Sequence, residues 1–151
     1  MEEEILMNIQ ERIGEIPELK TVDEDWGQLD MYSPNFPVQW PCCLIDVNDG
    51  SFSDIGKDFS KIPKSRQNGK FSVKLTLADM KLTPTSLRTS KAQKETAWAV
   101  FGLMKKIHEK VHDFSPAVNC SKLKRTAFGR VKRDDGVQEY AIYYAFESQN
   151  V

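Results

Sequence analysis

The stretch from Phe71 to Leu77 most constrains the fold, because its side chains alternate strictly between apolar and polar. A period of two predicts a β-strand with one buried face and one wet face. A second apolar run, 41–47, is bounded by a proline and by Asn48-Asp49-Gly50, and it predicts a buried strand followed by a turn. A short extended piece is expected over 19–23.

The C-terminal third predicts a β-hairpin. Segments 123–132 and 137–146 flank an Asp-Gly pair at Asp135-Gly136, which is among the strongest turn signals for a hairpin. The second of these strands has an apolar, aromatic face formed by Tyr140, Ile142, Tyr144 and Phe146.

Two amphipathic helices are expected. The first lies at the N-terminus, where Ile5, Leu6, Ile9 and Ile13 recur at helical spacing, and it stops before Pro17. The second spans 92–114 behind a capping box, Ser90 to Gln93, and ends at Ser115-Pro116. Its apolar stripe consists of Ala97, Val100, Phe101, Met104, Ile107 and Val111.

This order of elements predicts one α+β domain over residues 1–151. We expect an antiparallel or mixed β-sheet of about four to five strands with two helices packed on one face. The polar stretches 25–39, 51–69 and 78–89 are expected to be loops, and loops this long inside a domain are usually functional or mobile.

The composition is that of a soluble globular protein, with 40% apolar and 28% charged residues. A net charge of −1 gives no overall electrostatic reason to expect nucleic acid or a membrane as partner. Three thiols, Cys42, Cys43 and Cys120, cannot all pair within one chain, which favours a reduced, intracellular protein. The acidic start lacks the basic region of a signal peptide.

One motif has the form of a catalytic site. His108-Glu109-Lys110-Val111-His112 matches H-E-x-x-H, in which two histidines one helical turn apart bind Zn²⁺ and the glutamate activates water. These are the chain's only histidines, so a third ligand would have to be a residue such as Glu139 or Glu147, which nothing marks. We therefore interpret the histidines as boundary residues of the helix and predict no enzyme, no metal site and no cofactor.

Two sets of residues are candidates for interaction. The first hairpin strand is basic, with Lys124, Arg125, Arg130, Lys132 and Arg133. Such a strand can contact phosphates, be a solvated edge that blocks unwanted pairing, or face an acidic partner. The second set is Trp26, Phe36 and Trp40, in a proline-bearing loop. These aromatic residues either fold back onto the core or anchor a protein–protein contact.

The order of the predicted elements and the residue types within them resemble those of the small tail terminator or tail completion proteins of long-tailed phages and prophages. The resemblance is carried by the acidic N-terminal helix, segments 19–26, 41–47, 71–77 and 92–114, the turn 134–136 and the last strand, 140–146.

The resemblance implies a structural protein that forms a ring, commonly a hexamer, on the end of the tail tube. Its expected partners are other copies of itself, the tail tube protein and the head-tail connector, and no membrane. Non-specific proximity to DNA in the ring lumen is compatible with the basic hairpin. The implied location is the bacterial host cytoplasm during assembly and then the virion tail. An intracellular adaptor domain without catalytic activity is the alternative, and a zinc-dependent hydrolase comes after it.

Overall fold

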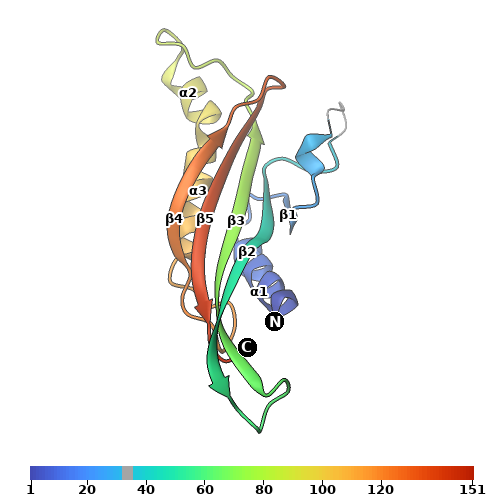
Figure 1. The fold of residues 1–151 in the computed structure, drawn as a ribbon. Helices are drawn as coiled ribbons and strands as arrows, with labels where there is room; N and C mark the ends of the chain where they lie inside the picture. Colours follow the sequence, from blue (N-terminus) through green and yellow to red (C-terminus); the bar gives the residue numbers. More distant parts are fainter. Residues whose placement is uncertain (32–35) are drawn as a thin grey trace.

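The computed structural model describes residues 1–31 and 36–151 and contains a five-stranded sheet with the order β1-β2-β3-β5-β4. The strands are β1 (Thr21–Glu24), β2 (Cys42–Lys57), β3 (Ser65–Met80), β4 (Lys124–Val131) and β5 (Val137–Ser148). β1 pairs with β2 in parallel and the other neighbours are antiparallel, so the sheet is mixed (Figure 1). The α+β class and the strand number are confirmed.

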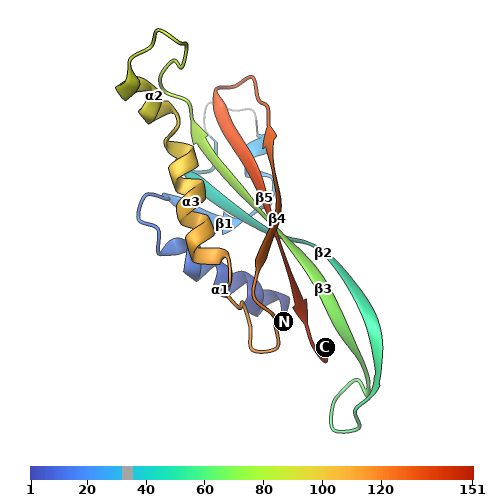
Figure 2. The same cartoon turned by 90° about the vertical axis from the view of Figure 1, so that its left-hand side faces the viewer.

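The helices are α1 (Glu2–Gly14), α2 (Lys91–Ala97) and α3 (Ala99–Val111), with a short 3₁₀ helix, η1 (Gln28–Asp30), in the loop before β2. α1 and α3 cover the same face of the sheet, and α2 continues from α3 toward one end of it (Figure 2). No helix in the described part of the chain is long and apolar enough to cross a bilayer.

The prediction of one continuous helix over 92–114 was wrong. Its capping box is present, since the Gln93 amide donates to the Ser90 hydroxyl at 3.3 Å. The helix is interrupted at Trp98, whose φ of −100° and ψ of 13° lie outside the helical range. α2 buries a single residue, Ala97, so core packing does not hold it in line with α3.

The sheet carries a core cluster on each face. The larger lies under α1 and α3 and includes Cys43 and the predicted aromatic face of β5. The smaller lies on the opposite face and includes Cys42 and Leu44. The two adjacent cysteines therefore point to opposite faces, as alternation along a strand requires. Burial raises the pKa of the Cys42 thiol to about 12 and raises that of Cys43 as well.

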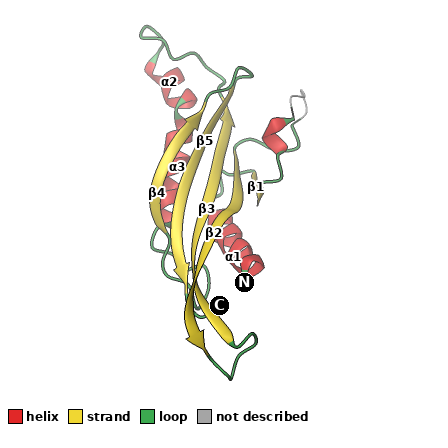
Figure 3. Ribbon diagram, in the orientation of Figure 1, coloured by secondary structure: helices red, strands yellow, loops and turns green. Residues whose placement is uncertain are grey.

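The prediction of a polar loop over 51–69 was wrong. β2 and β3 continue through this region as a hairpin whose turn occupies 58–64; β2 is exposed there, and β3 is partly buried over 66–68. Pairing of β3 with β5 ends at Gly69↔Ser148, and residues 53–68 form an extension, here called the arm. At its base, Gln67 exchanges backbone hydrogen bonds with Val151, so the arm is two-stranded only beyond this point. Figures 1 and 3 show the arm projecting from the end of the sheet. Because the β2 strand of the arm buries neither face, its sequence lacks the alternation that marks a strand.

Candidate interaction surfaces

The basic strand predicted from the sequence is β4, which forms one outer edge of the sheet, and all eight of its residues are exposed. The Lys124 ammonium bonds to the Asp113 carboxylate at the end of α3. The guanidinium of Arg130 lies 5.9 Å from the centre of the Tyr140 ring, a cation–π contact. We call β4 with its flanking residues Lys122 and Lys132 the basic edge.

Aromatic side chains adjoin the basic edge, which the sequence analysis did not foresee. Phe128 in β4 is 63% exposed, although β4 pairs it with the buried Ile142. Phe101 of α3 is also exposed and packs edge-on against Tyr140 at 5.3 Å, beside Arg130. Phe101 and Phe128 are 27 residues apart and come to the same surface only through tertiary packing, so no local pattern could reveal that surface.

Arg133 does not belong to this exposed surface. Its side chain is 6% exposed and forms ion pairs with Asp135 at 2.7 Å and Glu139 at 2.9 Å. The guanidinium also donates to the Leu29 carbonyl and lies 5.7 Å from the Phe36 ring. The expectation that Arg133 is a surface residue is therefore corrected: it fastens the β4–β5 turn to the loop before β2.

The three loop aromatics divide between core and surface. Phe36 and Trp40 pack against the smaller core cluster and meet edge to face at 5.4 Å, so these two fold back as one of the alternatives predicted. Trp26 is 53% exposed, and its indole N–H lies 3.4 Å from the Asp23 carboxylate. Trp26 thus remains available for contact. Pro34 lies outside the described residues.

The opposite edge of the sheet carries an acidic groove, which we define by its lining residues: Glu2, Glu3, Leu6, Glu24, Ile45, Asp46 and Val47. The groove has a volume of about 410 Å³ and lies between the start of α1 and strands β1 and β2. Leu6 and Val47, partly buried, pack against the core and give the groove an apolar floor. Its rim carries the carboxylates of Glu2, Glu3 and Glu24, whereas Asp46 alternates with Ile45 and Val47 and points its side chain to the other face of the sheet.

The arm is the third surface. Phe59 and Ile62 in its turn are 74% and 96% exposed, and Ile55 is exposed along the strand. The Lys64 ammonium lies 5.5 Å from the centre of the Phe59 ring. At the base of the arm, Phe52 packs edge-on against Phe71, which stacks on Phe146.

The two histidines are engaged in packing rather than gathered with further ligands. His108 Nδ1 is 3.0 Å from the Tyr144 hydroxyl, and His112 Nδ1 accepts the Arg125 amide proton at 3.2 Å. Burial, with the nearby positive charge of Arg125, lowers the pKa of His108. Burial also raises the pKa of Tyr144 to about 12, so its hydroxyl stays protonated and can donate.

No third metal ligand joins the histidines. Within residues 1–31 and 36–151, no group of three or more His, Cys, Asp or Glu side chains could hold a metal ion. Glu139 is bound by Arg133, and Glu147 lies 3.9 Å from the Lys70 ammonium.

Comparison with known proteins does not assign the chain to a family. Neither the protein-family models nor the curated proteins that were searched match the chain. The basic edge, the acidic groove and the arm are therefore the features from which a function is inferred.

Proposed function

We propose that this chain is a structural assembly subunit of a phage or prophage tail, a tail terminator that works as one member of a closed ring and has no catalytic activity. The observation that carries the proposal is the arm, an extension whose apolar side chains Ile55, Phe59 and Ile62 are largely exposed to solvent.

The energetics of the arm favour a role in assembly. Fully burying a side chain such as Phe59 or Ile62 is worth roughly 1.5–3 kcal/mol, and the isolated subunit gains little of this. An isolated two-stranded hairpin is also marginally stable in water. A partner that covers the arm would both bury these side chains and hold the hairpin in place.

The shape of the subunit suits a ring. A closed ring is built from heterologous contacts, in which two different surfaces of each subunit meet. The described chain has different surfaces on its two lateral edges and an arm at one end, so all arms in a ring would project toward the same side. We propose that the arms contact the tail tube protein and that the opposite end faces the head-tail connector. The location that follows is the bacterial host cytoplasm during assembly and then the virion tail.

The first test is the mass of the purified chain by light scattering over a concentration series, followed by electron microscopy of the largest species. The expected result is a discrete oligomer, commonly a hexamer, with a central opening. A monomer at every concentration that also fails to bind the tube protein would favour the adaptor domain instead.

A second test concerns the tail itself. Tail tube protein from the same genetic element should polymerise to shorter tubes in the presence of the chain, because a terminator stops growth at the tube end. The double variant Phe59→Ser/Ile62→Ser should lose this effect while its thermal unfolding stays unchanged. Leu87→Ser is the matched control, since Leu87 is as exposed as these two but lies in the loop after β3. Tubes of unchanged length with the unmodified chain would overturn the proposal.

The absence of catalysis is part of the proposal and can be checked directly. We expect the purified protein to contain zinc well below one equivalent by elemental analysis, and His108→Ala to leave that content unchanged. Stoichiometric zinc that is lost in His108→Ala would instead support the hydrolase.

A further inference from the structure

We infer that the basic edge of one copy docks on the acidic groove of the next copy, so that neighbouring subunits meet through opposite edges of their sheets. This inference rests on the proposed ring and specifies the surfaces that form it.

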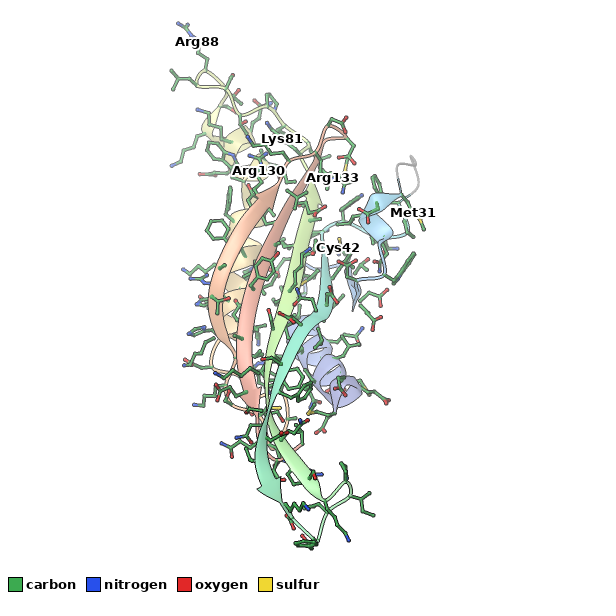
Figure 4. All side chains as sticks on the ribbon, in the orientation of Figure 1. Met31, Cys42, Lys81, Arg88, Arg130 and Arg133 are labelled. Atoms are coloured by element: carbon green, nitrogen blue, oxygen red, sulfur yellow. The ribbon has the colours of Figure 1, made fainter. Side chains whose placement is uncertain are left out.

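The positions of the two surfaces suit a head-to-tail contact. β1 is the first strand of the sheet and β4 is the last, so the groove and the basic edge lie on opposite lateral edges. Figure 4 shows Arg130 on the β4 side and Met31 beyond β1 on the other side. When one surface of a subunit binds a different surface of the next subunit, the pair still has one free surface of each kind. Further subunits therefore add until the ring closes.

Charge identifies a second copy as the occupant. The basic edge, over residues 122–132, contains five lysines and arginines, and residues 121–133 contain no acidic residue. The groove presents the carboxylates of Glu2, Glu3 and Glu24 and no lysine or arginine, while Asp46 alternates with Ile45 and Val47 and points to the other face of the sheet. The chain as a whole has a net charge of −1, so the excess of positive charge on this edge is offset elsewhere on the molecule. Such a molecule attracts its own kind in one orientation and repels it in the others.

The charged groups on both surfaces are largely free to pair between copies. Within the described part of the chain, Glu3 and Glu24 take part in no ion pair, and neither do Arg125 and Arg130. Lys124 is already paired with Asp113 and is left out of the contact.

Apolar groups also match. Phe128 projects from the basic edge, and the groove has the apolar floor formed by Leu6, Ile45 and Val47. The outer edge of β4 is unpaired among the described strands, whereas on β1 the Val22 and Glu24 carbonyls already accept from the side chains of Gln10 and Gln28. The contact is therefore made by side chains, in which a charged and aromatic strand buries apolar area over the groove.

The experiment is a charge reversal on each surface, with the oligomer measured by light scattering. One variant reverses the basic edge, Arg125→Glu/Arg130→Glu, and the other reverses the groove, Glu3→Lys/Glu24→Lys. In each variant alone, the basic edge and the groove carry charge of the same sign and repel each other. The protein concentration at the midpoint of assembly should therefore rise by at least about 30-fold. Mixing the two variants in equal amounts should restore assembly, because each then supplies the complement that the other lacks.

Controls and outcomes separate this inference from the proposed function. Arg88→Glu/Lys91→Glu changes two exposed charges away from both surfaces and should assemble normally. Thermal unfolding of every variant shows whether it is folded. If the single-surface variants still assemble, or the mixture fails although both are folded, the inference is wrong and the ring stands. If the unmodified chain assembles neither alone nor on the tube, the proposed function itself fails, and the inference with it.

Discussion

Arg133 binds four groups at once and joins two distant parts of the chain. Its guanidinium contacts Asp135 in the β4–β5 turn, Glu139 in β5 and the Leu29 carbonyl, and it lies over the Phe36 ring. Both carboxylate partners have side chains that are less than one-fifth exposed. A buried charge that loses its partner is costly, so this residue acts on stability.

We therefore predict that Arg133→Ala destabilises the fold by about 3–5 kcal/mol, because it leaves the buried Glu139 carboxylate unpaired. Chemical denaturation would measure the loss. Arg130→Ala is the matched control, since Arg130 is exposed and makes one cation–π contact, and its loss should cost less than about 1 kcal/mol. Equal losses in the two variants would contradict the assignment.

The same cluster predicts a pH dependence. The hydrogen bonds from Arg133 lower the pKa of Asp135 below its ordinary value. A carboxyl whose pKa is lower in the folded state stabilises the fold above its unfolded pKa of about 3.9 and loses that contribution as the pH falls. The free energy of unfolding should thus decline below about pH 4, and Asp135→Asn should show a smaller decline over the same range. A decline of equal size in Asp135→Asn would mean that other groups are responsible.

At the scale of elements, the base of the arm depends on a glycine. A Cβ at Gly69 would come within 2.5 Å of the Phe71 ring, which is held between Phe52 and Phe146. The ring cannot turn away without breaking its edge-on contact with Phe52 or its stack on Phe146. Gly69 is therefore a position of close approach, where the arm leaves the core.

We predict that Gly69→Ala destabilises the fold by roughly 1–3 kcal/mol, because it overpacks this aromatic stack. Gly102→Ala, in α3, is the matched control. Its Cβ would meet nothing within 4 Å, and alanine favours a helix over glycine, so stability should rise by up to about 1 kcal/mol. Thermal unfolding of the two variants should move in opposite directions, and a shift of the same sign would refute the packing argument.

Elements with one buried face could be predicted from the sequence. The strand around Phe71–Leu77, the N-terminal helix and the C-terminal hairpin were all predicted. Each buries one face, so its apolar residues recur every two residues in a strand or every 3.6 residues in a helix. The arm was missed because its β2 strand buries neither face, and because Gly56, Pro63 and Asn68-Gly69 suggested turns. The break at Trp98 was missed because the apolar stripe continues across it.

The candidate surfaces were only partly predictable. The charges of β4 are visible in the sequence, but the exposed aromatics beside them come from α3, and the groove combines residues of α1, β1 and β2. The inward turn of Arg133 depends on Leu29 and Phe36, about 100 positions earlier. Contacts between residues so far apart in the sequence depend on the topology of the fold, and no local sequence pattern predicts them.

At the scale of the whole molecule, the separation of charge predicts a dependence on salt. If opposite edges attract each other, raising the salt concentration from about 0.05 M to 0.5 M should shift assembly to higher protein concentration, because ions screen exposed charges. Light scattering at a series of salt concentrations would measure this shift. An oligomer that strengthens with salt would point to apolar contacts, such as those of the arm, as the main source of association.

The interior position of β5 has a consequence for how the chain reaches its fold. β5 follows the other described strands in the sequence, yet it lies between β3 and β4, and its pairing of Phe71 with Phe146 joins positions about half the given chain apart. Contacts between such distant positions form slowly, because the intervening chain must first be closed into a loop. Until β5 has been made, the hairpin of β2 and β3 therefore presents an open apolar edge, which is prone to aggregate. A chain truncated before Val137 should accordingly yield insoluble protein rather than a smaller stable domain.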